Sequence, residues 1–136
     1  MRRQLEHTVL PACERNGLGQ VVFSPLGQGV LSGKYGGGQR PEDSRAADDE
    51  RNLFMNAYLA PEEIAKVDRL KPLAAETGIS LPQLALAWCL RQPNVASAIV
   101  GVTRISQLDD NVAASGIRLP EAIAAQIDEI FPPPAD

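Results

Sequence analysis

The sequence predicts an α/β chain in which two short parallel strands alternate with five or six helices. Two β-rich runs, residues 18–23 and 95–100, have the length and apolar character of strands buried in a parallel sheet. Apolar residues recur every three or four positions in the segments before, between and after these runs, as they do on one face of a helix. A helix between two strands is the crossover that a parallel pair requires.

The N-terminal third contains the first helix, the first strand and a long loop. Apolar positions from Leu5 to Cys13 predict a helix over residues 4–15, and Asn16-Gly17 supplies its stop. The strand at residues 18–23 follows at once. Beyond it the chain is rich in glycine and then polar and charged, so residues 36–51 are expected to form a flexible loop.

The remaining helices are indicated by the residues at their ends. Pro61 stands at an early helical position, Gly78 at a stop, Ser80 at an N-cap and Pro93 just beyond a helix end. The predicted helices span residues 61–77, 81–91, about 106–115 and 120–131, and residues 132–136 are expected to fray.

The small number of strands bears on domain organisation. A chain of 136 residues is long enough for one modest domain. Two strands are nevertheless few, because a parallel sheet is normally buried on both faces and flanked by further strands. The pattern leaves two architectures open, a helical cluster around a two-stranded ribbon or a part of a larger fold.

Charge and hydropathy disfavour several classes of function. Lys and Arg total 13 against 17 Asp and Glu, a net charge of −4, and no broad basic face for nucleic acid or anionic lipid is evident. No stretch approaches the roughly 20 apolar residues of a membrane-spanning helix, and no signal-peptide core follows the N-terminus. We expect a cytoplasmic protein without a nucleic-acid or membrane partner.

The cysteines and the histidine give no sign of a metal site. Cys13 and Cys89 lie far apart in apolar helical patterns, without a CxxC motif, which is typical of buried packing cysteines. The one histidine, His7, lies beside Glu6 on the polar side of the first helix and is expected to be solvated rather than catalytic.

The first stretch with a chemical signal is residues 23–35, Phe-Ser-Pro-Leu-Gly-Gln-Gly-Val-Leu-Ser-Gly-Lys-Tyr, where the first strand ends in a glycine-rich loop. Backbone N–H groups, a hydroxyl and a lysine are the groups that bind a pyrophosphate. The alternative is that these glycines only make a surface loop flexible.

The second stretch is residues 99–111, Ile-Val-Gly-Val-Thr-Arg-Ile-Ser-Gln-Leu-Asp-Asp-Asn, again a strand end, a glycine and a helix. Gly101 allows close approach of a ligand to the backbone, and Thr103, Arg104 and the helix N-terminus offer donors to an anion such as a ribose phosphate. Taken alone, the stretch equally fits an ordinary turn into a serine-capped helix with a solvated arginine.

Together, and in this order, the two stretches resemble the seventh and eighth strand-to-loop units of the aldo-keto reductases, and most closely the potassium-channel β-subunit-like branch. Ser24-Pro25-Leu26 with Gly29, Leu31, Gly33, Lys34 and Tyr35 resembles that branch's cofactor-clamp loop. Residues 82–88, Pro-Gln-Leu-Ala-Leu-Ala-Trp, resemble the helix before its last strand, and the likeness continues through Gly101, Gln107-Leu108 and Asn111. The resemblance spans nearly the whole chain and implies the C-terminal portion of a (β/α)₈ barrel, not a complete barrel.

The resemblance also implies NADP(H) as the cofactor, with a role for each matching residue. Residues Ser24 to Gln28 are expected to line the pyrophosphate and nicotinamide, and Lys34 and Arg45 to hold phosphates. Thr103 and Arg104 are expected to meet the 2′-phosphate that distinguishes NADP from NAD. The adenosine end is expected to be bound by Gln107, Asp110 and Asn111. The implied cofactor-binding set is Ser24, Pro25, Leu26, Gly27, Gln28, Lys34, Arg45, Gly101, Thr103, Arg104, Gln107, Asp110 and Asn111.

The family's proton-donating residues have no counterparts here. Reduction of an aldehyde or ketone in the family uses a tyrosine tuned by Asp, Lys and His, all from the first half of the barrel. Tyr35 and Tyr58 do not stand in the matching motif. Two strands grip part of a cofactor without enclosing a substrate, so we expect no catalytic residue in this chain.

Three hypotheses follow for the chain as a whole. It is a fragment of an NADPH-dependent oxidoreductase, a nucleotide-binding module completed by a partner chain that holds the missing strands, or a non-catalytic remnant that self-associates. Exposed strand faces and edges would favour association in each case.

Overall fold

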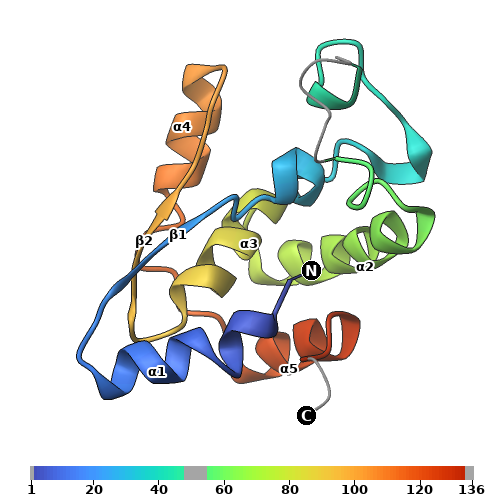
Figure 1. Ribbon diagram of the computed structural model, residues 1–136. Helices are drawn as coiled ribbons and strands as arrows, with labels where there is room; N and C mark the ends of the chain where they lie inside the picture. Colours follow the sequence, from blue (N-terminus) through green and yellow to red (C-terminus); the bar gives the residue numbers. More distant parts are fainter. Residues whose placement is uncertain (1, 48–54, 134–136) are drawn as a thin grey trace.

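The computed structural model describes residues 2–47 and 55–133. Within these ranges the chain is an α/β structure with two parallel strands, which confirms the predicted fold class (Figure 1). The helices and strands are α1 (Val9–Arg15), β1 (Gln20–Phe23), α2 (Pro61–Thr77), α3 (Leu81–Leu90), β2 (Val95–Ile99), α4 (Ile105–Val112) and α5 (Glu121–Ile130).

The first predicted helix is divided in two. A short 3₁₀ helix covers Gln4–Glu6 and α1 begins only at Val9, so the continuous helix expected over residues 4–15 is wrong. The physical reason is local: Pro11 has no N–H to donate to the His7 carbonyl, so the helix is interrupted there and α1 begins with the proline in its first turn. The other helices begin and end within a few residues of their predicted ends.

End signals explain why α2 and α3 meet where they do. Pro61 occupies the first turn of α2, and Gly78 ends it in the left-handed conformation with φ at 68°. The Ser80 hydroxyl then accepts a hydrogen bond from the Gln83 N–H at 3.2 Å, and the Gln83 side chain accepts one from the Ser80 N–H. This reciprocal capping box starts α3 one turn after α2 has ended.

The two strands pair directly and in parallel. Val21 lies beside Ser97 and Phe23 beside Ile99, with an irregularity in the pairing between Gln20 and Val21. One face of the sheet packs toward α3, where Val95 is buried. On the other face Phe23 is 80% exposed, so the expectation of strands buried on both sides is wrong for this face among the described residues.

The core lies beneath α2, α3 and α5. It is closed from the loop side by Val30, Tyr35 and Met55, which are almost completely buried. The side chains that the helices contribute to the core lie on one face of each helix, at helical spacing. They include Ile64, Val67, Leu70, Leu73, Leu81, Leu84, Ile123, Ile127 and Ile130.

The loop that was expected to be flexible has local structure in its described part. Short 3₁₀ turns cover Gly36–Gly38 and Arg45–Ala47, and Ser44 and Ala46 are buried. Residues 48–51 of that loop, and residues 134–136 of the predicted tail, lie outside the described residues. The two cysteines are unpaired and half-buried rather than fully buried.

No single helix in the described ranges is long and apolar enough to cross a membrane. Helices α2 and α3 reach that length and composition only when they are taken together, and they are bent by 89° at their junction. Buried core helices pass the same test, and both helices contribute to the core here.

Candidate functional site

A polar cavity of about 610 Å³ lies where the carboxyl ends of the two strands meet. In parallel sheets this edge is where ligands bind, because the loops that follow neighbouring strands converge there. All the predicted site residues except Gly27 and Arg104 line the cavity. Its other lining residues are Phe23, Gly29, Ser32, Glu42, Asp43, Ser44, Pro82, Ile99 and Val100.

The loop after β1 has an unusual backbone at the cavity wall. Ser24 and Gln28 have φ at 52° and 58°, and among the described residues they are the only non-glycine positions with positive φ. The left-handed region is costly for such residues and is enriched at functional sites. The Gln28 amide donates to the Ser24 hydroxyl at 3.1 Å and its oxygen accepts from Arg45, so the two positions are tied together.

Lys34 is placed by the glycines of the same loop. A Cβ at Gly29 would lie 3.5 Å from Lys34 Cε and 3.6 Å from its Nζ, which are ordinary contact distances, so the lysine side chain lies directly against this glycine. The ammonium lies 5.3 Å from the centroid of the Tyr35 ring, which is itself buried. Among the described residues Lys34 has no carboxylate partner, which leaves its charge available at the cavity.

The loop after β2 has its backbone donors directed at one acceptor. The side-chain oxygen of Gln107 accepts from the Thr103 N–H at 2.9 Å, the Thr103 hydroxyl at 3.2 Å and the Arg104 N–H at 3.3 Å. Three donors that converge on one oxygen form a position where an anionic oxygen would also fit.

Arg104 is engaged by a carboxylate from the other loop. Its guanidinium forms an ion pair with Asp43, and both side chains are more than 60% exposed. An exposed pair of this kind contributes little to stability. The pair lies at the rim of the cavity, because Asp43 lines it and Arg104 does not.

Asp110 and Asn111 are positioned by packing of α4 on α3. The Asp110 carboxylate accepts from the Ser80 hydroxyl at 2.8 Å and from the Gln83 amide at 2.9 Å, and the Gln83 amide also reaches the Asp110 carbonyl at 3.0 Å. Asn111 is buried. The carboxylate of Asp110 therefore has protein partners already and acts first as a link between the two helices.

Nine lining residues lie outside the predicted set, and three of them matter for binding. Phe23 ends β1 at the cavity wall, Asp43 pairs with Arg104, and the hydroxyl of buried Ser44 has no hydrogen-bond partner among the described residues. The position of Phe23, directly before Ser24 at a strand end, was a usable signal. Nothing local in the sequence indicates the places of Asp43 and Ser44, which depend on how the loop folds back.

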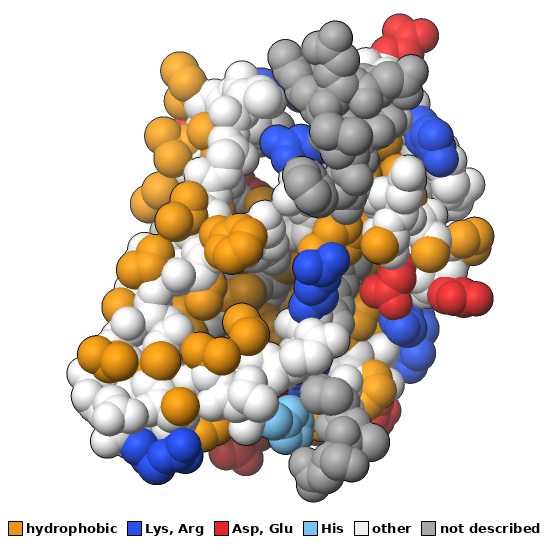
Figure 2. Space-filling view, in the orientation of Figure 1, with side chains coloured by type: hydrophobic (Ala, Val, Ile, Leu, Met, Phe, Trp, Pro, Cys, Tyr) orange, Lys and Arg blue, Asp and Glu red, His pale blue; other side chains and the backbone are white. Residues whose placement is uncertain are grey.

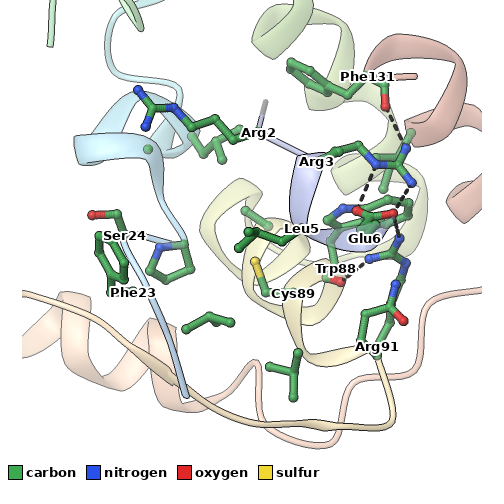
Figure 3. A pocket seen from close by; sticks show the side chains of 18 of the residues that line it. Arg2, Arg3, Leu5, Glu6, Phe23, Ser24, Trp88, Cys89, Arg91 and Phe131 are labelled. Carbon is green, nitrogen blue, oxygen red and sulfur yellow. Dashed lines mark hydrogen bonds and ion pairs between the residues drawn. The ribbon is translucent and has the colours of Figure 1, made fainter. Parts of the chain in front are cut away.

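A second cavity of about 470 Å³ lies between β1 and the helices, and Ser24, Pro25 and Gly27 of the predicted site line it (Figure 3). Its walls are mainly apolar and include Leu5, Trp88 and Cys89. At one end Arg3 binds Glu6 through two hydrogen bonds of 2.9 and 2.6 Å, and Arg91 approaches the same carboxylate at 3.5 Å. The charged cluster closes this end of the cavity.

Burial and nearby charge shift the pKa values of two groups in this wall, Glu6 and Cys89. Burial by itself raises the pKa of Glu6, but the hydrogen bonds and charge of Arg3, together with the charge of Arg91, outweigh it and hold the pKa below its usual value. Burial raises the pKa of the Cys89 thiol, which is therefore protonated at neutral pH. The wall offers no reactive thiolate, and within the described ranges no three His, Cys, Asp or Glu side chains are grouped as metal ligands.

Comparison with known proteins supports the resemblance found in the sequence. The sequence profile of the Aldo/keto reductase family matches residues 1–131. A probable voltage-gated potassium channel subunit beta from Arabidopsis thaliana is 44% identical over 113 residues, which cover 83% of this chain and 34% of that protein. A protein of the same description from Oryza sativa subsp. japonica is 41% identical over 129 residues, covering 95% of this chain and 39% of its own length.

These matches confirm the resemblance on which the sequence prediction rested. The chain spans little more than a third of the length of the relatives it matches. The matched region contains both strand-end loops and all the helices between them. This chain belongs to the aldo/keto reductase family.

Proposed function

We propose that this chain binds NADP(H) in the polar cavity at the strand ends, as the cofactor-binding segment of an aldo-keto reductase. One observation carries the proposal: two loops separated along the chain by α2, α3 and β2 converge on one cavity, and each brings cations or backbone donors to it. A dinucleotide phosphate needs both, because its charge is distributed along an extended molecule.

The loop after β1 would bind the pyrophosphate. Lys34 and Arg45 supply positive charge, and the Ser44 hydroxyl supplies a donor that is buried at the cavity wall without a partner among the described residues. A buried hydroxyl without a partner costs stability, and a phosphate oxygen would satisfy it. The residues therefore fit an anionic ligand.

The loop after β2 would bind the 2′-phosphate. Arg104 and the N–H groups of Thr103 and Arg104 already converge on carboxylate and amide oxygens, those of Asp43 and Gln107. A phosphate would take the place of these neighbouring oxygens. A guanidinium–phosphate hydrogen bond contributes about 1.5–3 kcal/mol, which favours NADP over NAD.

Phe23 would contact the nicotinamide end. Its ring is exposed at the end of β1 and lines the cavity beside Ser24, so one aromatic face is open to a flat heterocycle. Asp110 and Asn111, which line the cavity from α4, would contact the adenosine end. When bound in a complete enzyme of this family, NADPH supplies a hydride to the carbonyl carbon of an aldehyde or ketone.

A titration with NADPH and NADH tests the proposal. Nicotinamide fluorescence and thermal stability would be followed together in the wild-type chain, in Arg104→Ala and in Arg118→Ala, an exposed arginine away from the cavity. We expect saturable NADPH binding that weakens about 10- to 100-fold in Arg104→Ala and not in Arg118→Ala. Affinity for NADH should change little in either variant, because NADH lacks the 2′-phosphate.

Two results would count against the proposal. Absence of saturable NADPH binding to a chain that unfolds cooperatively would show that the cavity is no nucleotide site. Equal loss of NADPH and NADH affinity in Arg104→Ala would remove the assignment of Arg104 to the 2′-phosphate.

A further inference from the structure

A tight turn carries Lys34 to the polar cavity. The Gly36 N–H donates to the Gly33 carbonyl at 3.3 Å, so Lys34 and Tyr35 are the two central residues of the turn. The Tyr35 ring is buried in the core, whereas Lys34 lines the cavity. The Lys34 ammonium lies 5.3 Å from the centroid of the Tyr35 ring. The path of this turn therefore decides where the charge of Lys34 lies.

Helix α2 lies beside the turn, and one of its side chains spans both ends of the turn (Figure 1). A Cβ at Gly33 would lie 3.3 Å from Lys71 Cε, which is a tight contact. A Cβ at Gly36 would lie 2.6 Å from Lys71 Nζ, closer than Cβ atoms come to other atoms. The absence of side chains at these two glycines is what allows the lysine to lie against the backbone of the turn.

The Asp68 carboxylate holds the Lys71 ammonium in this place. The Nζ–Oδ1 distance is 2.6 Å, and the two residues are three positions apart on α2. Asp68 Oδ1 would lie 3.0 Å from a Cβ at Gly36, so both members of the ion pair face the turn. Acidic and basic side chains lie next to one another on the surface over α2 (Figure 2). Because the pair adds no net charge beside Lys34, its effect on the turn is one of contact.

We propose that Lys71 is a positioning residue for nucleotide binding: held by Asp68, it supports both ends of the turn and so keeps the Lys34 ammonium at the cavity. This inference rests on the proposed function of the cavity as an NADP(H) site. Lys71 does not line the cavity, so it acts through Lys34. A phosphate that meets a lysine already in place loses less conformational entropy on binding.

A matched lysine on the same helix separates contact with the turn from a general loss of charge. Lys66 pairs with Glu63, also three positions away, at an Nζ–Oε1 distance of 2.6 Å. Its ammonium lies 5.8 Å from the centroid of the Phe131 ring, and it does not line the cavity. Lys71→Ala and Lys66→Ala each remove one partly exposed ion pair, which costs little stability.

A change in the turn itself tests the same contact without altering α2. Gly36 does not have a positive φ, so its backbone accepts alanine, but the new methyl group and the Lys71 ammonium could not both keep their places. Gly36→Ala should therefore reproduce the effect of Lys71→Ala. Its control is Gly19→Ala, where the new Cβ would meet the Ala96 Cβ at 3.7 Å, an ordinary contact distance.

The NMR chemical shift of the Lys34 ε-methylene protons reports the position of this side chain without any nucleotide. The ring current of Tyr35 should move these protons away from the shift of a free lysine, and their signal is assigned by its loss in Lys34→Ala. We expect the shift to return toward the free value in Lys71→Ala and in Gly36→Ala, and to persist in the two controls. A free-lysine shift in the unaltered chain would overturn the inference. So would an unchanged shift in Lys71→Ala, or in Gly36→Ala if Lys71→Ala does not fold.

Titration with NADPH and NADH measures the consequence for binding. Both dinucleotides contain the pyrophosphate, so Lys71→Ala should weaken both by the same factor, about three- to tenfold. The double variant Lys34→Ala/Lys71→Ala should bind no more weakly than Lys34→Ala alone, because Lys71 acts through Lys34. Losses that multiply in the double variant would overturn the positioning role. If the unaltered chain binds neither dinucleotide, the proposed function fails, and the NMR comparison still decides whether Lys71 places Lys34.

Discussion

At the scale of single residues, charge pairing decides which groups a ligand meets. Arg104 is the strongest donor at the rim of the cavity, yet its guanidinium is held by Asp43. An exposed ion pair of this kind is worth at most about 1 kcal/mol, so a phosphate with two negative charges competes with it readily. Breaking the Arg104–Asp43 pair therefore costs a phosphate ligand little binding free energy and does not prevent its binding.

Asp43→Asn should therefore tighten NADPH binding by about two- to fivefold, because Arg104 no longer has to leave a carboxylate. Affinity for NADH should stay the same. The matched control is Glu42→Gln, which removes a neighbouring negative charge that also lines the cavity. If both variants tighten NADPH binding equally, the effect is one of general charge and the role of the Asp43–Arg104 pair is refuted.

A second residue-scale prediction concerns pH. Glu6 has a pKa below its usual value in the folded chain, since two hydrogen bonds from Arg3 outweigh its burial. The stabilisation is complete above the unfolded pKa of about 4.3 and is lost as pH falls through the lower folded value. Glu6→Gln should cost about 1.5–3 kcal/mol of unfolding free energy at pH 7 and much less at pH 3.

Urea unfolding at the two pH values checks this prediction. Glu14→Gln, at an exposed position of α1, is the control and should have little effect at either pH. A loss of stability in Glu6→Gln that is the same at pH 3 as at pH 7 would mean that the carboxylate charge is not what matters.

At the scale of elements, one hydrogen-bond cluster joins the start of α3 to the middle of α4. Ser80 caps α3 and also donates to Asp110 at 2.8 Å, and Gln83 binds the same carboxylate. These contacts turn α4 so that Gln107 and Asn111 line the cavity while its apolar side stays exposed. A local cap thus fixes the orientation of a helix that belongs to the candidate site.

Ser80→Ala should remove about 1–2 kcal/mol of unfolding free energy, because it deletes both a helix cap and a bond to a carboxylate. Hydrogen exchange should increase for amides of α4 as well as for the first turn of α3. Ser115→Ala, at an exposed position after α4, serves as the control. Faster exchange in α3 alone would show that the cap does not hold α4.

At the scale of the whole molecule, the core and the bare surfaces lie on different sides. Helices α2, α3 and α5 enclose the buried cluster, whereas the outer face of the sheet and one side of α4 have no cover among the described residues. The polar cavity lies where these two sides meet, since Phe23 and Ile99 belong both to the bare face and to its lining.

Much of the fold was predictable because its signals are local. Helix α2 runs from Pro61 to Thr77 as expected, since a proline at the first turn and a left-handed glycine at the end act within a few residues. The helix over residues 4–15 was predicted wrongly, because Pro11 has no N–H for the His7 carbonyl and stands instead in the first turn of α1, which begins at Val9.

The candidate site, like the fold, was predictable only where its signals lie close together in the sequence. The convergence of two strand-end loops could be expected from the parallel crossover alone, and most of the predicted residues line one cavity. Ser44 and Asp43 could not be found in this way. Their positions depend on a loop that folds back across the chain to reach Arg104.

By itself the sequence determined the α/β class, the order of the elements and the two strand-end loops that line the polar cavity, because these follow from short-range periodicity, caps and strand ends. Only the tertiary structure decided that Arg104 pairs with Asp43, that Asp110 joins α4 to α3, and that one face of the sheet stays bare. These features depend on which distant residues come into contact, and a pattern along the chain holds no information about which surfaces are left without a partner.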